Sequence, residues 1–228
     1  MESALAEQVA TVRANMAAAC ARSHRPESSV RLLAATKTVA PGRIREAYDL
    51  GLRLFGENRV QERAAKQAAL TDLDGCQWHL LGPLQSNKAA AALRLFDVIE
   101  TVDSVALAQR LSRLAQATVR VMLEINIGRE AQKHGFPPES SAPALAEIAE
   151  LPHIEVTGIM TVPPQEASQQ DMRRHFASLK ELSEQLRGGR ANWELSMGMS
   201  HDYEAAIEEG ATIVRLGTAL FGARGTKL

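Results

Sequence analysis

The stretch RLLAATKTVAPGRIREAYDLGLRLFGEN, residues 31–58, contains the unit from which the rest of the chain is built. An apolar run over residues 31–37 is typical of a buried strand, and the segment after it has its apolar residues at helical spacing. Pro41 suits the first turn of that helix, and Gly51 suits its C-terminal stop. Because a second apolar run follows over residues 53–58, the stretch predicts a strand–helix–strand unit with parallel strands.

The same alternation continues along the chain, with amphipathic segments such as SVALAQRLSRLAQ and QQDMRRHFASLKELSEQLRGG between the apolar runs. The predicted strands cover residues 31–37, 53–58, 77–82, 96–103, 120–127, 154–162, 193–198 and 212–222. Eight such units predict an α/β fold, a single TIM (β/α)8 barrel that occupies residues 1–228 as one domain. A doubly wound open sheet is the alternative, but no GxGxxG motif follows the first strand.

Composition excludes several classes of protein. Hydrophobic residues make up 45% and charged residues 23% of the chain, and the net charge is -1, so the sequence is typical of a soluble globular protein that binds neither nucleic acid nor membrane. The N-terminal segment MESALAEQVATVRANMAAACA has charges within an apolar helical pattern, which predicts an extra amphipathic helix rather than a signal peptide. Cys20 and Cys76 form no CxxC pattern, so we expect no disulfide framework, no metal site and a cytoplasmic location.

Lys37 closes the first predicted strand, at the end of the barrel where functional groups gather. Strand alternation places Leu33, Ala35 and Lys37 on one face. If that face lines the barrel, Lys37 points into its mouth, where a lysine in an apolar pocket becomes a nucleophile toward carbonyl groups. The alternative is a side chain just past the strand with its ammonium group in solvent.

Polar residues also occupy inward positions of later strands. In residues 120–127 the apolar set that includes Val121 and Leu123 should face the helices, which directs Glu124 and Asn126 into the barrel. Arg215 lies in the middle of the last strand and, if it faces inward, needs a partner, because an unpaired buried charge is costly.

The last two strands end in motifs that suit an anion. Ser200 follows Gly198 and can cap the next helix while offering its hydroxyl group, and Gly217 and Thr218 can offer backbone N–H groups and a hydroxyl. An ordinary helix cap and a packing glycine are the alternative for either motif alone. Together, at the ends of the seventh and eighth strands of a TIM barrel, they favour a phosphate cradle. A rim lysine with such a cradle suits a phosphorylated aldehyde or ketone, as in class I aldolases and pyridoxal 5′-phosphate proteins.

Several segments resemble one family in order along the chain: ATK at the end of the first strand, FGENRVQE, WHLLGPLQSNK and SMGMSHDYEAAIEEGATIVRLGTALFGAR. They resemble the pyridoxal phosphate homeostasis protein family, whose fold is similar to the N-terminal barrel of alanine racemase. The resemblance extends from about residue 5 to Arg224. Arg59 departs from the pattern, since many relatives carry an aromatic residue there.

The resemblance implies that pyridoxal 5′-phosphate binds to this chain as an aldimine with one lysine. The implied cofactor-binding residues are Lys37 (the aldimine), Asn58, His79, Ser200, Arg215, Gly217 and Thr218. Of the other lysines, Lys66 and Lys180 lie in charged helical stretches and are expected to be solvated. For Lys88 and Lys133 the alternatives to an ordinary surface position are a second contact with the cofactor or a role in cofactor transfer.

The resemblance also implies a protein that binds the cofactor and takes part in intracellular vitamin B6 homeostasis without catalytic turnover. We expect no second β-rich domain of the kind that completes the alanine racemase site, and therefore a monomer. Arg215 next to the pyridine nitrogen would disfavour protonation there and weaken the ring as an electron sink. An amino-acid racemase and a Schiff-base aldolase of sugar phosphates remain as alternatives. The expected partners are pyridoxal phosphate and the apo-forms of enzymes that use it.

Overall fold

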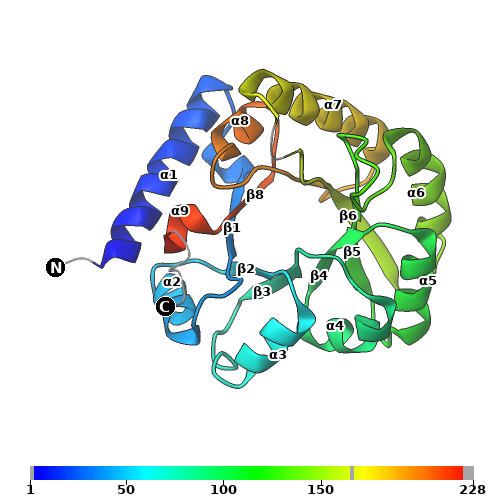
Figure 1. The fold of residues 1–228 in the computed structure, drawn as a ribbon, viewed down its shortest axis with the longest axis horizontal. Coiled ribbons are helices and arrows are strands. Elements are labelled where there is room, and N and C mark those ends of the chain that lie inside the picture. The colour runs from blue at the N-terminus through cyan, green and yellow to red at the C-terminus, as the bar shows by residue number, and fades with distance from the viewer. Residues whose placement is uncertain (1–2, 165–166, 223–228) are drawn as a thin grey trace.

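Eight parallel strands form a closed barrel in chain order in a computed structural model of the chain, which describes residues 3–164 and 167–222 (Figure 1). β1 pairs with both β2 and β8, which closes the sheet. The predicted TIM barrel is therefore confirmed. The strands are β1 (Arg31–Ala35), β2 (Leu54–Glu57), β3 (Gln77–Leu80), β4 (Val98–Val102), β5 (Val119–Glu124), β6 (Ile154–Met160), β7 (Glu194–Ser196) and β8 (Ile213–Leu216).

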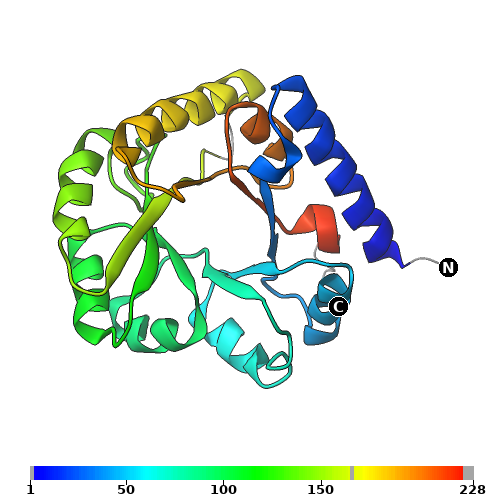
Figure 2. The same ribbon diagram turned by 180° about the vertical axis from the view of Figure 1, so that it is seen from behind.

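Helices surround the barrel, and the extra N-terminal helix α1 lies outside them, beside α8 and α9 (Figures 1 and 2). No helix in residues 3–164 and 167–222 is long and apolar enough to cross a membrane. The α-helices are α1 (Ala4–Arg22), α2 (Pro41–Asp49), α3 (Val60–Gln67), α4 (Ala89–Leu95), α5 (Val105–Leu114), α6 (Ser141–Ala149), α7 (Gln169–Arg187), α8 (Tyr203–Glu208) and α9 (Thr218–Phe221). Short 3₁₀ helices are η1 (Glu27–Ser29), η2 (Ser86–Lys88) and η3 (Pro138–Ser140).

Local sequence signals account for the ends of these helices. Pro41 is the first residue of α2, where its missing N–H leaves no bond unmade. The hydroxyl groups of Ser104 and Ser168 accept hydrogen bonds from the first turns of α5 and α7. Gly188 ends α7 with a φ of 51°, in the left-handed region that glycine adopts without strain.

Apolar residues pack in two separate layers. The larger layer lies between the sheet and the helices, and there the rings of Phe55 and Trp78 stack with centroids 5.3 Å apart. The smaller layer fills the barrel interior. β5 shows the predicted alternation, because Val121 and Leu123 belong to the outer layer and Met122 to the inner one. The inner apolar residues are Leu33, Leu54, Val98, Met122, Met160 and Ile213.

All eight predicted strands end earlier in the structure, and the differences in the first and the last bear on the site. β1 stops at Ala35, and Lys37 lies in the following turn. β8 stops at Leu216, because Thr218 begins the short helix α9 rather than continuing the apolar run. Periodicity does not distinguish a strand from a helix in a short apolar run, so the last predicted strand, residues 212–222, included both β8 and α9.

Candidate functional site

Lys37 lies exposed at the C-terminal end of the barrel, in the turn between β1 and α2. Thr36 before it is fully buried, whereas Thr38 after it has a φ of 63°. A β-branched residue rarely adopts a positive φ, so the surrounding contacts determine the path of this turn. Lys37 thus lies just past β1 with its side chain exposed, which is the alternative given for it above, and it does so at the C-terminal end of the barrel.

The loops after β7 and β8 meet at Ser200. The Ser200 Oγ accepts hydrogen bonds from the backbone N–H of Gly217 at 3.3 Å and from that of Ala219 at 3.1 Å. Asp202, not Ser200, is the N-cap of α8, so the expectation that Ser200 caps this helix is wrong. Its hydroxyl instead joins the two loops. Thr218 lies exposed between the two donors.

The N–H donors of Gly217 and Ala219 follow β8, and Lys37 follows the neighbouring strand β1. β8 pairs with β1, with Leu216 opposite Ala34. A Cβ atom added to Gly217 would lie 3.4 Å from the carbonyl oxygen of Ala35, so the chain passes closely here. The sequence-predicted residues Ser200, Gly217 and Thr218 are therefore brought together beside the turn of Lys37.

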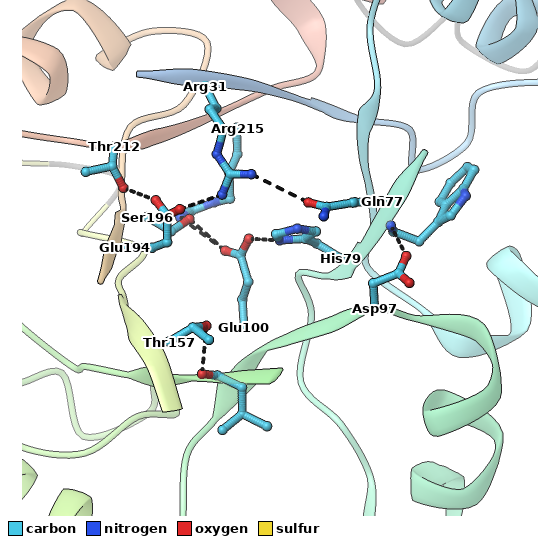
Figure 3. Close-up of polar contacts among 12 residues, drawn as sticks. Arg31, Gln77, His79, Asp97, Glu100, Thr157, Glu194, Ser196, Thr212 and Arg215 are labelled. Carbon is cyan, nitrogen blue, oxygen red and sulfur yellow. Dashed lines mark hydrogen bonds and ion pairs between the residues drawn. The ribbon is translucent and has the colours of Figure 1, made fainter. Parts of the chain in front are cut away.

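Arg215 lies inside the barrel in a chain of polar contacts (Figure 3). Its Nη1 donates to Ser196 Oγ at 2.7 Å, and its Nη2 donates to the carbonyl oxygen of Thr161 at 2.7 Å. Ser196 Oγ in turn donates to Glu100 Oε2 at 2.6 Å, and His79 Nδ1 lies 2.6 Å from Glu100 Oε1. The buried arginine thus has the partner that the sequence required.

The charges of this network stabilise one another. Burial alone would raise the pKa of Glu100, but the hydrogen bond and electrostatic interaction with His79 and the charge of Arg215 outweigh it and lower that pKa. Burial lowers the pKa of Arg215, against the opposing effect of the Glu100 carboxylate. Since a guanidinium group has a very high reference pKa, Arg215 remains a cation and Glu100 an anion at neutral pH.

His79 and Asn58, the two residues assigned from the matching motifs, occupy different positions. His79 lies in the barrel interior, and its Nε2 is buried with no hydrogen-bond partner among the described residues. Asn58 follows β2 and is half-buried. Gly82, after β3, lies so close that an added Cβ would be 2.2 Å from the Asn58 carbonyl oxygen. Glycine is therefore required there for the ends of β2 and β3 to meet.

A cavity of about 220 Å³ lies beside the ends of β5 and β6, lined in part by Glu124 and Lys133. Burial raises the pKa of Glu124 above its ordinary value. The Lys133 ammonium group donates to the carbonyl oxygens of Val162 at 3.3 Å and Pro163 at 3.1 Å, and so connects the two loops. The Asn126 amide closes the β5 loop and also lines the cavity. Lys88 lies in η2, half-buried, before α4.

The sequence analysis missed two features, the carboxylate of Glu100 inside the barrel and the ion pair between Lys66 and Glu57. Glu100 was passed over, although a carboxylate inside the apolar run FDVIETVD is a signal of the same kind as Arg215. The expectation that Lys66 is solvated is wrong, because its ammonium group forms an ion pair with the buried Glu57 at 2.7 Å and the Lys66 side chain is only 12% exposed. Nothing in the helical pattern of α3 shows that the outward face of β2 carries a carboxylate at that position.

The site combines a lysine at the barrel mouth, two backbone N–H donors with nearby hydroxyl groups, and a buried cation below them. These groups suit an anionic molecule with a carbonyl group, because amide donors bind phosphate and an amine reacts with an aldehyde. No cluster of metal-ligating side chains occurs in the part of the chain that the structure describes.

Comparison with known proteins identifies relatives that cover nearly the whole chain. The family model of the alanine racemase N-terminal domain matches residues 8–225. The "Pyridoxal phosphate homeostasis protein" of Aquifex aeolicus is 43% identical over 223 residues, which are 96% of this chain and 97% of the relative. The protein of the same name from Pseudomonas aeruginosa is 45% identical over 226 residues, 97% of this chain and 96% of the relative.

Solved structures agree with these matches. PipY of Synechococcus elongatus with PLP bound is 40% identical, covers 96% of this chain and 100% of its own, and superposes with a TM-score of 0.82. Alanine racemase of Clostridium difficile is 19% identical, with a TM-score of 0.73 and coverage of 93% of this chain and 56% of its own, and shows the common fold alone. The chain belongs to the pyridoxal phosphate homeostasis protein family, within the fold of the alanine racemase N-terminal domain.

Proposed function

We propose that this protein binds pyridoxal 5′-phosphate through a Schiff base with Lys37 and takes part in vitamin B6 homeostasis. The observation that carries the proposal is the position of Lys37 in the turn after β1, which pairs with β8, the strand that leads to the donors gathered at Ser200. A relative with 40% identity has been solved with PLP bound, and the relatives with 43% and 45% identity are named as pyridoxal phosphate homeostasis proteins.

Each group of the site has a matching part of the cofactor. The backbone N–H groups of Gly217 and Ala219 and the hydroxyl groups of Ser200 and Thr218 would hold the phosphate, as donors at the ends of strands do in other barrels. Both N–H groups donate to Ser200 Oγ, so the phosphate would have to share or replace these bonds. Arg215 would lie near the ring, and Asn58 and His79 are proposed from the matching motifs to line the pocket.

When bound, the cofactor supplies an aldehyde that reacts with a primary amine. Lys37 would supply the amine for that reaction, and the carbonyl oxygen would leave as water. The bond is reversible by hydrolysis or by exchange with another amine. A site of this kind stores the cofactor and releases it, which suits a carrier.

We propose further that the site has no appreciable catalytic turnover. The Arg215–Glu100 network supports this, because it keeps a permanent cation inside the barrel. A cation beside the ring nitrogen disfavours protonation of that nitrogen, and an unprotonated ring withdraws electrons less strongly. The relatives from Aquifex aeolicus and Pseudomonas aeruginosa are named as homeostasis proteins rather than as enzymes.

The setting of this activity follows from the same features. We propose that residues 1–228 act as one domain and as a monomer, which size-exclusion chromatography with light scattering tests. The two free cysteines support action in the cytoplasm. The proposed recipients are apo-forms of enzymes that use pyridoxal phosphate, with no nucleic-acid or membrane partner.

The experiment that tests the function is a comparison of the loaded protein with candidate substrates. We expect protein loaded with pyridoxal phosphate to pass the cofactor to an apo-enzyme, while amino acids are neither racemised nor decarboxylated at enzymatic rates. Racemisation at such rates would overturn the carrier assignment. Trapping by borohydride with sugar phosphates, but not with pyridoxal phosphate, would instead identify an aldolase.

A further inference from the structure

The turn that carries Lys37 is bound from outside the barrel by helix α3. The Lys66 ammonium group donates to the carbonyl oxygen of Thr36 at 2.9 Å, and Glu62 Oε2 accepts from the backbone N–H of Thr38 at 3.3 Å. The first oxygen belongs to the peptide group before Lys37, and the N–H belongs to the peptide group after it. Both peptide groups that set the backbone direction of Lys37 are therefore in contact with α3.

Glu57, at the end of β2, connects this helix to the strand that precedes Lys37. Its Oε1 accepts from Thr36 Oγ1 at 2.7 Å and from Lys66 Nζ at 2.7 Å. Thr36 Oγ1 also lies 3.1 Å from the carbonyl oxygen of Gly56. Thr36 is thus fixed through its side chain and its carbonyl group, directly before the lysine.

These contacts come at a cost to folding. Glu57 is fully buried, and its Oε2 has no hydrogen-bond partner among the described residues. Burial outweighs the bonds from Lys66 and Thr36 and raises the pKa of Glu57. Well-packed apolar side chains usually stabilise a fold as well as a buried ion pair does. We therefore attribute the ion pair to the geometry of the turn rather than to the stability of the fold.

We propose that Glu57, Glu62 and Lys66 are positioning residues for Lys37, which fix the turn so that its amine enters the barrel mouth next to the phosphate cradle. This inference rests on the proposed Schiff base at Lys37. All three residues lie in the segment FGENRVQERAAK (55–66), so one short stretch builds both the end of β2 and the support of the lysine. Such support matters because misplacement of a reacting group by about 1 Å can slow a reaction by ~100-fold.

The experiment separates binding of the cofactor from its reaction with the lysine. Lys66→Met removes the donor to Thr36, and Glu62→Leu removes the acceptor for Thr38. Gln67→Met is the matched control, on an exposed position of the same helix. Pyridoxine 5′-phosphate is the second probe, since it keeps the ring and phosphate but has no aldehyde to react with an amine.

We expect Lys66→Met and Glu62→Leu to slow Schiff-base formation with pyridoxal phosphate by about tenfold in stopped-flow absorption, with unchanged affinity for pyridoxine 5′-phosphate. Lys66→Arg and Glu62→Gln keep a donor and an acceptor and should restore most of the rate. The Gln67→Met control should react like the wild type. If Lys66→Met does not fold, Glu62→Leu still tests the inference, because it removes only one bond at the surface.

The outcomes distinguish this inference from the proposed function. Wild-type protein that forms no Schiff base would overturn the function itself. A normal wild-type reaction with unchanged rates in both variants would overturn the positioning role alone. Equal loss of affinity for both phosphates would also overturn it, because the helix would then support the whole site rather than the lysine.

Discussion

Glu100 is fully buried in the barrel, yet its environment favours the charged form. It accepts hydrogen bonds from His79 and Ser196, and the Arg215 guanidinium lies 3.9 Å away. A buried charge of this kind is tolerated only with such partners. The carboxylate is therefore the group that allows a permanent cation at Arg215 below the barrel mouth.

Glu100→Gln should destabilise the protein by about 3 kcal/mol at neutral pH, because it leaves the Arg215 cation buried without a full counter-charge. The pKa of Glu100 is lowered in the folded chain, so its contribution is complete above the ordinary pKa and is lost as the pH falls through the folded value. The difference between variant and wild type should therefore shrink when the pH is lowered from neutral to below the ordinary carboxyl pKa of about 4.3. Urea unfolding at both pH values measures it.

The matched control is Glu155→Gln, at an exposed position of β6. It should change the free energy of unfolding by less than about 0.5 kcal/mol. A loss in Glu100→Gln that stays the same or grows in acid would contradict a carboxylate stabilised as the anion.

Ser200 is the residue through which the cradle can be weakened without a change of backbone. Ser200→Ala removes the oxygen that accepts from Gly217 and Ala219 and the hydroxyl group that is proposed to bind the phosphate. We expect the affinity for pyridoxal phosphate to fall about tenfold, since one hydrogen bond to a charged group contributes about 1.5 kcal/mol or more. Equilibrium titration followed by absorption measures the change. An unaltered affinity would exclude Ser200 from the phosphate site.

At the scale of single elements, the sequence predicted which segments form strands better than where the strands end. The run TIVRLGTALFG contains β8 and the start of the cradle, but its apolar residues conceal the change from strand to helix after Leu216. Helix α3 was recognisable from its spacing, yet its contact with the turn of Lys37 depends on long-range packing. No local pattern encodes that Glu57 and Lys66 meet.

Gly82 tests how closely β2 and β3 must approach at the site. In Gly82→Ala the new Cβ would lie 2.2 Å from the Asn58 carbonyl oxygen, so the two strand ends must separate. We expect a loss of about 2 kcal/mol in the free energy of unfolding and weaker binding of the cofactor. Thermal or urea unfolding and cofactor titration measure the two effects.

Gly42→Ala is the control for this substitution, because an added Cβ meets nothing within 4 Å and the residue lies in α2. It should leave stability unchanged or raise it by about 0.5 kcal/mol. Equal behaviour of the two alanine variants would show that the approach of β2 and β3 tolerates a side chain.

At the scale of the whole molecule, the barrel was predictable because each strand–helix unit carries its own apolar pattern and parallel strands need such crossovers. The rim positions of Lys37, Ser200, Gly217 and Thr218 followed from strand ends alone. The interior network did not, since His79, Glu100 and Ser196 come from three strands and meet only when the sheet closes. The first helix was expected, and its place beside α8 and α9 emerges only from the structure (Figure 1).

Cofactor binding should stabilise the whole fold by mass action. At a concentration 100 times the dissociation constant, pyridoxal phosphate should add about 2.7 kcal/mol to the free energy of unfolding. The melting temperature should therefore rise with cofactor concentration in the wild type. The rise should be much smaller in Lys37→Ala, which calorimetry can measure. An equal rise in both proteins would show that Lys37 contributes little to binding.

The central claim is that Lys37 holds the cofactor covalently, and one absorption experiment tests it most directly. Wild-type protein and Lys37→Ala are incubated with pyridoxal phosphate, their visible spectra are recorded before and after borohydride, and the reduced protein is mapped by mass spectrometry. The account predicts a Schiff-base band in the wild type that is absent from the variant, with the added mass on Lys37 after reduction. A band that survives the substitution, or added mass on another lysine, would contradict it.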